Sequence, residues 1–354
     1  MDFSLFYFAN DSTEKDHDRY ALLLEGARFA DRNGFSAVWT PERHFHPFGG
    51  LYPNPAVTGA AVAAVTERIG IRAGSVVAPL HHPLRIAEEW SVVDNLSGGR
   101  AGLSFASGWH ATDFALRPEN YADRRRLLAE QVEQVRALWR GEKVTFRDGV
   151  GDERELRIYP PPVQPELPVW VTSAGGVETF RNAGRLGAGL LTHLLGQDTG
   201  DLAAKITEYR AAAAECGRTD GWRGHVVLMV HTFLGEDDDA VREAVRRPLG
   251  DYLRSSLGLL LGSSLDGRRI DASRLTPDDV DFIVARSFDR YYDGGGLLGT
   301  VEKVAAHVER FREIGVDEIA CLVDFGLPAD DVLGGLGRLA RLRELTAGDG
   351  RTAP

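Results

Sequence analysis

Short apolar runs alternate with amphipathic segments along almost the whole chain. The runs predict strands buried on both faces, because they lack the polar alternation of half-exposed strands. The segments between them repeat apolar positions at helical spacing, which predicts helices with one buried face. The predicted strands cover residues 3–8, 36–39, 71–78, 101–106, 169–172, 189–195, 225–234 and 318–325. The predicted helices cover residues 19–32, 55–67, 83–96, 124–140, 177–186, 201–216, 237–246, 300–314 and 332–345.

Eight strand–helix units predict an α/β fold, a (β/α)8 TIM barrel closed by the last helix. A doubly wound open sheet is the alternative architecture. We expect a single domain over residues 1–354, although the length also allows two. Proline-rich residues 141–168 predict an extended excursion, and residues 247–296 predict a helical insertion before the last unit. Because long barrel insertions are commonly lids, we expect residues 247–296 to act as a gate.

Composition and charge exclude several classes of partner. The chain is 43% hydrophobic and carries a formal net charge of -11, so we expect a globular protein that binds neither nucleic acid nor an anionic membrane. The opening residues MDFSLFYFANDSTEKD contain no basic leader and no run of membrane-spanning length, which predicts a cytoplasmic protein. Cys216 and Cys321 lie far apart and form no disulfide framework.

Polar side chains follow the predicted strands, at the end where the loops of a barrel converge. Six of the ten histidines fall there: His44, His46, His81, His82, His110 and His193. No HExxH helix or carboxylate-rich set accompanies them, so we expect no metal site. His44 and His110 are the better candidates for catalysis, because aromatic and polar residues surround each of them. His46, His81 and His82 are equally well explained as packing or loop residues.

The stretch VTSAGGVETF runs from a strand into a helix through residues 173–176. Small residues at a helix N-terminus let backbone N–H groups approach an anion, which predicts a phosphate site. The run DGGGLLGT at 293–300 contains GxGxxG, but an acidic helical segment precedes it where a dinucleotide site needs a strand. We interpret it as a flexible loop with Thr300 as helix N-cap. The chain has no P-loop GK[ST] and no GxSxG elbow.

Six stretches together resemble the bacterial luciferase-like flavin monooxygenases: VWTPERHFHPFGGLYPNPAV, IRAGSVVAPLHHPLRIAEEW, DNLSGGRAGLSFASGWHATDF, WVTSAGGVETF, LLTHLLGQ and GVDEIACLVDFG. The likeness covers nearly the whole chain and is greatest for the subgroup that acts in polyketide and nonribosomal peptide biosynthesis. It implies a TIM barrel, a homodimer formed through outer helices, and an oxidoreductase that uses reduced FMN from a flavin reductase and O2 as co-substrate. The implied substrate is a natural-product intermediate, free or tethered to a carrier protein. Such chemistry needs a water-poor pocket with an acid/base group.

The resemblance also implies roles for particular residues. It places a non-proline cis peptide between Gly74 and Ser75, against which the flavin ring packs, and a phosphate-binding turn at 173–176. His44 lies in an element where the family uses histidine for catalysis, and Arg43 replaces the first histidine of the luciferase pair.

Luciferase has a cysteine and then an arginine where this chain has Ala106 and Ser107. That arginine helps to hold the phosphate, so here the phosphate charge is left to backbone amides, His110 or Arg126. Trp109 and His110 are expected to wall and hydrogen-bond the cofactor site. The candidate residues are, for catalysis, His44, His110 and Arg43; for the cofactor, Gly74, Ser75, Ala106, Ser107, Trp109, His110, Arg126, Ser173, Ala174, Gly175, Gly176 and His193; and for the substrate, Phe8, Asn10, Trp39 and Glu42.

Two other functions stay open at this point. A deazaflavin- or flavin-dependent dehydrogenase of the same superfamily would transfer hydride without oxygen and would share the barrel and the phosphate turn. The stretches ERHFHPFGG and SGWH favour the monooxygenase over it. A flavin-binding relative without catalysis is the second alternative, because Arg43 and Ala106 depart from luciferase.

Overall fold

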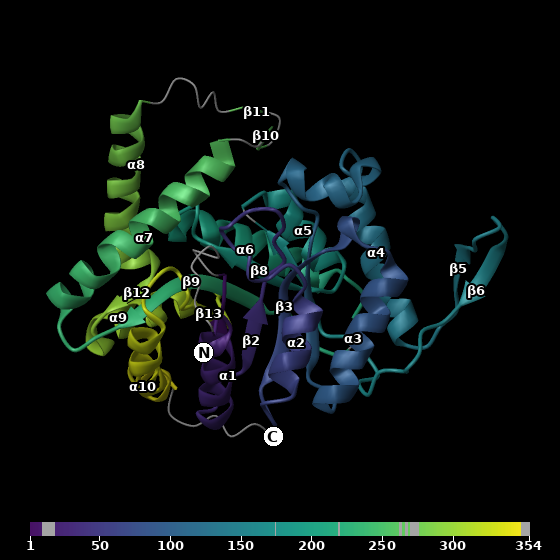
Figure 1. Ribbon diagram of the computed structural model, residues 1–354, viewed down its shortest axis with the longest axis horizontal. Coiled ribbons are helices and arrows are strands. Elements are labelled where there is room, and N and C mark those ends of the chain that lie inside the picture. The colour runs from purple at the N-terminus through teal and green to yellow at the C-terminus, as the bar shows by residue number, and fades with distance from the viewer. Residues whose placement is uncertain are drawn as a thin grey trace.

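Eight parallel strands form a closed barrel in the computed structural model of the protein (Figure 1). The structure describes residues 1–8, 18–173, 175–218, 220–261, 264–265, 268–269 and 276–347. Strand β13 pairs with β1, and β8 pairs with β9, so the sheet has no open edge within the ring. This confirms the predicted TIM barrel over the open sheet. In order around the ring, the strands are β1 (Asp2–Phe6), β2 (Ala37–Thr40), β3 (Gly70–Val77), β4 (Ala101–Ala106), β7 (Val169–Ser173), β8 (Gly189–His193), β9 (Val226–Leu234) and β13 (Glu318–Leu322).

Helices surround the barrel and bury its outer face (Figure 1). Local signals set the ends of these helices. In α3, the side chain of the N-cap residue His82 accepts the Leu84 N–H at 3.3 Å, and Pro83 is the first helical residue. The helix ends before Gly98, which has φ +68°. The helices are α1 (Ala21–Arg32), α2 (Pro55–Ala63), α3 (Pro83–Ser97), α4 (Arg124–Trp139), α5 (Val177–Arg185), α6 (Thr199–Ala214), α7 (Asp238–Leu261), α8 (Pro277–Arg290), α9 (Val301–Glu313) and α10 (Ala329–Thr346).

The excursion contains more structure than its sequence predicts, whereas the insertion is helical, as predicted, in α7 and α8. The excursion holds an antiparallel hairpin, β5 (Val144–Arg147) and β6 (Glu153–Leu156), which projects away from the barrel (Figure 1). The prediction that a helix ends at residue 246 was wrong, because α7 continues through Pro248 to Leu261. The reason is packing: the buried stripe of Val241 and Val245 continues past the proline at Leu249 and Tyr252.

The end of the insertion also differs from its prediction. Residues 293–300 were expected to form a flexible loop, but Tyr291–Gly295 form a π-helical turn and β12 (Leu297–Gly299) pairs with the end of β9. Thr300 is confirmed as an N-cap, since its hydroxyl accepts the Lys303 N–H at 3.3 Å.

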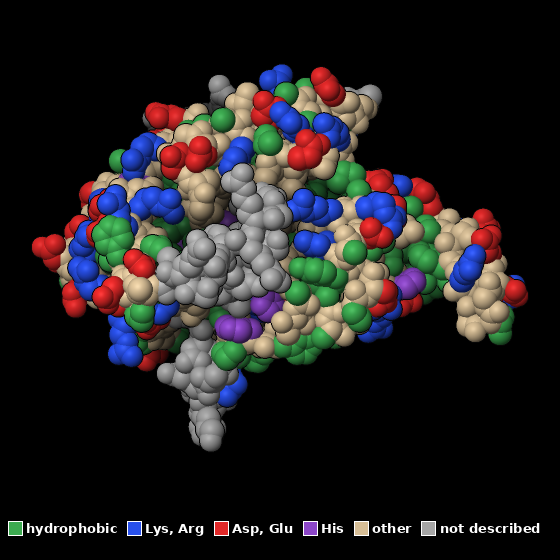
Figure 2. Space-filling view, turned by 90° about the horizontal axis from the view of Figure 1, so that it is seen from above, with side chains coloured by type: hydrophobic (Ala, Val, Ile, Leu, Met, Phe, Trp, Pro, Cys, Tyr) green, Lys and Arg blue, Asp and Glu red, His purple; other side chains and the backbone are tan. Residues whose placement is uncertain are grey.

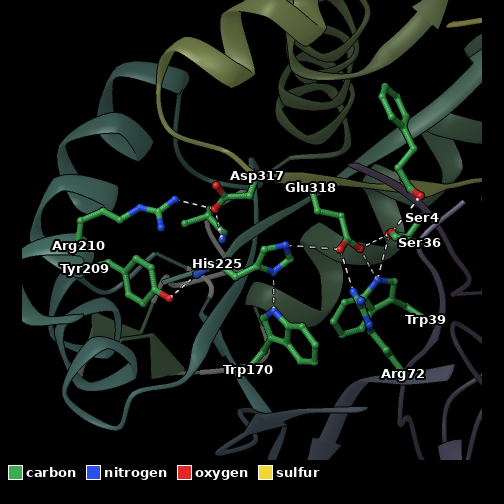
Figure 3. A network of polar contacts seen from close by, with 12 residues as sticks. Ser4, Ser36, Trp39, Arg72, Trp170, Tyr209, Arg210, His225, Asp317 and Glu318 are labelled. Carbon is green, nitrogen blue, oxygen red and sulfur yellow. Dashed lines mark hydrogen bonds and ion pairs between the residues drawn. The ribbon is translucent and has the colours of Figure 1, made fainter. Parts of the chain in front are cut away.

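A buried polar network fills the barrel toward the N-terminal ends of its strands (Figure 3). The guanidinium of Arg72 lies against the rings of Trp39 and Trp170, 5.0 and 4.6 Å from their centroids, and pairs with Glu318 at 2.8 Å. Burial raises the pKa of Glu318, but the charges of Arg72 and His225 outweigh it, so the net pKa is lowered. The charges at this end are therefore paired within the barrel, and in TIM barrels the functional site lies at the opposite, C-terminal ends of the strands.

Candidate functional site

A buried carboxylate at the C-terminal end of β2 organises two of the rim histidines. Oε1 of Glu42 lies 2.8 Å from Nε2 of His44 and 2.6 Å from Nε2 of His81, and Oε2 accepts the Val77 N–H at 2.7 Å. Burial raises the pKa of Glu42, but the hydrogen bonds from the two histidines outweigh it and lower the pKa overall. Burial lowers the pKa of His81, but its bond to Glu42 raises it by more. Glu42, predicted as a substrate contact, thus lies behind His44 and orients its ring.

A second cluster joins the loop after β2 to the loop after β4. Arg43 is 4% exposed, and its Nη1 lies 3.3 Å from Oδ2 of Asp113. Oδ1 of the same carboxylate lies 3.3 Å from Nδ1 of His110. Cζ of Arg43 lies 5.3 Å from the ring centroid of Trp109, whose side chain is 40% exposed. Arg43 and His110 therefore meet at Asp113, and Trp109 packs beside Arg43. Sequence reasoning missed Asp113, whose only signal was the three-residue spacing from His110.

The chain next to this cluster contains the cis peptide that the family resemblance implied. The bond between Gly74 and Ser75 is cis. A Cβ at Gly74 would lie 2.7 Å from Cε2 of Phe6, so no larger residue fits here. The hydroxyl of Ser75 contacts that of Thr172 at 2.8 Å, and Thr172 contacts Ser104 at 2.7 Å. A row of hydroxyls thus crosses β3, β7 and β4, and it can hydrogen-bond a polar cofactor ring.

The predicted phosphate turn lies between β7 and α5. Gly175 has φ +126°, a conformation that side chains rarely adopt, and its N–H donates to the Ser173 hydroxyl at 3.4 Å. Gly176 precedes α5 without any side-chain cap. The Thr179 N–H donates to the Gly176 carbonyl at 3.0 Å, which leaves the N–H groups of Val177 and Glu178 available for an anion. Ala174, predicted for the same turn, lies outside the described residues.

A lysine from α6 lies beside this turn, and sequence reasoning missed it as well. A Cβ on Gly175 would lie 3.5 Å from Nζ of Lys205, which donates to Oε1 of Gln197 at 2.8 Å. Of the lysines that the structure describes, Lys143 and Lys303 form ion pairs with carboxylates, whereas Lys205 does not. A helix N-terminus and an ammonium group without a counter-charge together favour a phosphate dianion.

The other cofactor candidates have different surroundings. Ala106 and Ser107 are half-buried where β4 ends. Arg126 has a largely exposed side chain in ion pairs with Asp123 and Glu130, which does not favour its predicted phosphate role. His193 accepts the N–H of the residue two positions later, at 3.1 Å, and burial lowers its pKa to about 4, so its imidazole is neutral at pH 7.

The remaining substrate candidates are Phe8, Asn10 and Trp39. Phe8 packs against Phe48 and Tyr252, with ring centroids 4.9 and 6.1 Å apart, under helix α7. Trp39 is fully buried in the network of Figure 3, at the other end of the barrel, which does not favour a substrate contact. Asn10 lies outside the described residues. Histidine side chains are visible at the surface on the face seen in Figure 2.

Histidine–carboxylate clusters at the strand ends of a barrel, together with an anion-binding turn, are typical of barrel oxidoreductases that use a phosphorylated cofactor. The chain belongs to the luciferase-like monooxygenase family, whose model matches residues 1–318. It is thus a member of a family of flavin-dependent oxidoreductases. In the part of the chain that the structure describes, no helix has both the length and the hydropathy needed to cross a membrane.

Individual relatives show the range of this family. The oxygenase component of the flavin-dependent trigonelline monooxygenase of Acinetobacter baylyi is 23% identical over 92% of this chain and 90% of its own. The monooxygenase RslO1 of Streptomyces bottropensis has a crystal structure that matches with a TM-score of 0.80, at 24% identity, over 96% of this chain and 98% of its own. An F420-dependent secondary alcohol dehydrogenase matches with a TM-score of 0.72 at 18% identity, over 98% of each chain. Proteins similar to this chain in sequence or fold are therefore named as dependent on a flavin or on the deazaflavin F420.

Proposed function

We propose that this protein is the oxygenase component of a two-component, FMN-dependent monooxygenase that oxidises a natural-product biosynthetic intermediate. A separate flavin reductase would supply the reduced FMN, as the trigonelline relative, named as an oxygenase component, suggests. The motifs that resemble the natural-product subgroup support the choice of substrate, which is either free or tethered to a carrier protein. Homodimerisation and a cytoplasmic location belong to the same proposal.

One observation carries the choice of cofactor: the uncapped turn before α5 lies beside the ammonium group of Lys205, which has no carboxylate partner among the described residues. A phosphate ester bound there would receive backbone N–H donors from the turn and a counter-charge from Lys205. The hydroxyl row of Ser75, Thr172 and Ser104 would hydrogen-bond the polar edge of the ring system. The residues present therefore fit FMN.

When bound, reduced FMN supplies the electrons that activate O2. The chain's own task is to exclude water and to move protons. Nε2 of His44 is held by Glu42, so Nδ1 is the atom that exchanges a proton with the substrate. His110 is the second candidate, because Asp113 orients its ring.

Comparing FMN with riboflavin, which has the same ring system but no phosphate, tests this proposal. We expect the protein to bind FMN about tenfold or more tightly than riboflavin in equilibrium titrations. Lys205→Met should lose most of that difference, while its riboflavin affinity stays unchanged. Lys143→Met is the matched control, because Lys143 lies on the hairpin β5–β6 and pairs with Glu155.

Two results would contradict the proposal. Equal affinity of the protein for FMN and riboflavin would remove the phosphate site. Tighter binding of F420 than of FMN, with no oxygen uptake when reduced FMN is supplied, would favour the dehydrogenase that the F420-dependent relative represents.

A further inference from the structure

The guanidinium of Arg43 has an edge that no group among the described residues satisfies. Its Nε and Nη2 are both buried and have no hydrogen-bond partner, and the residue is only 4% exposed. In the described part of the chain, it is the one arginine with two such atoms. Leaving buried N–H donors unpaired costs stability, so a position of this kind indicates a partner from outside the described part of the chain.

Other arginines at the core of the barrel show what a satisfied guanidinium looks like. Arg72 pairs with Glu318 at 2.8 Å and packs against two indole rings. Arg100 donates to backbone carbonyl groups at 2.7 to 2.8 Å and to the Thr66 hydroxyl at 2.9 Å. Arg43 has one contact of this kind, the 3.3 Å pair between Nη1 and Asp113, and that carboxylate is shared with His110.

The geometry of the free edge selects the chemistry of its ligand. Nε and Nη2 lie on the same edge of the planar guanidinium group, and their N–H bonds point outward in that plane, parallel to each other. This is the arrangement that a carboxylate occupies with both of its oxygens, each accepting one hydrogen bond. Burial lowers the pKa of Arg43 and Asp113 raises it, but an arginine stays cationic in proteins. A single carboxylate would therefore satisfy both donors and supply a counter-charge.

The surroundings of this edge are aromatic. The ring of Trp109 lies 5.3 Å from Cζ of Arg43 and is 40% exposed, and the ring of Phe45, in the same loop as Arg43, is 63% exposed. Exposed rings of this size at a barrel mouth offer flat surfaces to a flat ligand. Because the edge itself is covered, a ligand reaches it by displacing a neighbouring side chain, and the indole of Trp109 is a neighbour whose side chain is 40% exposed.

We propose that the substrate is an aromatic carboxylic acid, with its carboxylate on the Nε–Nη2 edge of Arg43 and its ring against Trp109. This inference rests on the proposed function, since it assigns the substrate class of the same strand-end site. Arg43 is then a specificity-determining residue that anchors the substrate close to His44 and His110. The replacement of a luciferase histidine by Arg43 marks a change of substrate and not a loss of catalysis.

The test compares 2-naphthoate with 2-naphthamide, which have the same ring system but differ in charge. Isothermal titration is performed with flavin-free protein and with protein loaded with oxidised FMN. We expect 2-naphthoate to bind about tenfold more tightly than the amide, and Arg43→Met to bind both within about twofold of each other. Arg43→Lys should be intermediate, because it keeps the charge but not the fork. Arg85→Met, on exposed α3 surface, is the control that should retain the preference.

Four results would overturn the inference. The unmodified protein could show no preference for 2-naphthoate, or Arg43→Met could retain it. FMN could displace 2-naphthoate competitively, which would assign the edge to the cofactor. If Arg43→Met fails to fold, a crystal structure of the unmodified protein with 2-naphthoate decides, and a carboxylate beyond hydrogen-bond distance of both Nε and Nη2 rejects the assignment. Loss of FMN selectivity over riboflavin, with the naphthoate preference intact, would instead reject only the proposed function.

Discussion

Glu42 links three parts of the site through one buried carboxylate. It contacts His44 and His81 and accepts the Val77 N–H from the end of β3. An ionised carboxylate can be buried when each of its oxygens is hydrogen-bonded, and here both oxygens are. The same contacts fix which nitrogen of His44 faces the site, so the stability of this cluster and its chemistry depend on the same group.

Glu42→Gln should lower the free energy of unfolding by about 2 kcal/mol near neutral pH, because the amide cannot accept all three bonds. The pKa of Glu42 is lowered on folding. Its contribution to the free energy of unfolding is therefore present above pH 4.5 and is lost as the pH falls through the folded pKa. The pKa of His81 is raised, so its contribution to stability is present below pH 6.5 and is lost as the pH rises through the folded pKa. Denaturant unfolding should therefore show the largest difference in stability between the unmodified protein and Glu42→Gln between pH 4.5 and pH 6.5. A difference independent of pH would contradict this account.

Individual residues of the site differ in how far the sequence predicts them. The family motifs identify His44, Gly74 and Gly175, because each lies at the end of a strand that can be located from its apolar run. Lys205 and Asp113 were missed for a physical reason. Lys205 comes from the middle of α6 and reaches the turn through side-chain length, and Asp113 follows β4 by several residues, so no periodicity relates either of them to the site.

Helix α7 connects the insertion to the mouth of the barrel through Tyr252. The centroid of its ring lies 4.8 Å from that of Phe48 and 4.4 Å from that of His231. His231 lies in β9 and is 2% exposed, and burial lowers its pKa to about 3, so it packs as a neutral aromatic ring. The insertion is therefore seated on an aromatic cluster of the barrel, and its gating role stays a prediction.

Tyr252→Ala should lower the free energy of unfolding by about 3 kcal/mol, because it leaves a cavity among these rings. The loss should be local, so amide hydrogen exchange should increase in α7 and α8 more than in β1 to β4. Hydrogen-exchange mass spectrometry measures this directly. Phe282→Ala on α8, where the ring is 63% exposed, is the control and should change little. An equal increase in every strand of the barrel would contradict the expectation.

The elements that the sequence predicts well are those with a long, uniform pattern. The eight barrel strands lie close to their predicted ranges, because strands buried on both faces are continuous apolar runs. The hairpin strand β6 could not be predicted in this way, since all four of its residues are exposed. Strand β12 has only three residues, and α7 crosses a proline because its tertiary packing outweighs the local penalty.

The barrel as a whole has two chemically different ends. One end holds the ion pair of Arg72 and Glu318, with the guanidinium against two indole rings (Figure 3). At the other end, Lys205 has no carboxylate partner among the described residues, and Arg43 has two donors without partners. In a TIM barrel the C-terminal ends of the strands carry the chemistry and the N-terminal ends carry stability. The pattern of paired and unpaired charge follows that division.

The outer surface offers a place for the proposed homodimer. Val92 and Leu96 lie one turn apart on α3, 44% and 60% exposed, so they form one apolar face of the helix. Placing two carboxylates there, as Val92→Glu with Leu96→Glu, should convert a dimer to a monomer, because each interface would bury unpaired charges. Light scattering should give twice the mass of one chain for the unmodified protein. Val150→Glu is the control and should give the same mass, because Val150 lies on the hairpin and its side chain is 82% exposed. A monomeric unmodified protein would reject the dimer, and a double variant that stays dimeric would place the interface elsewhere.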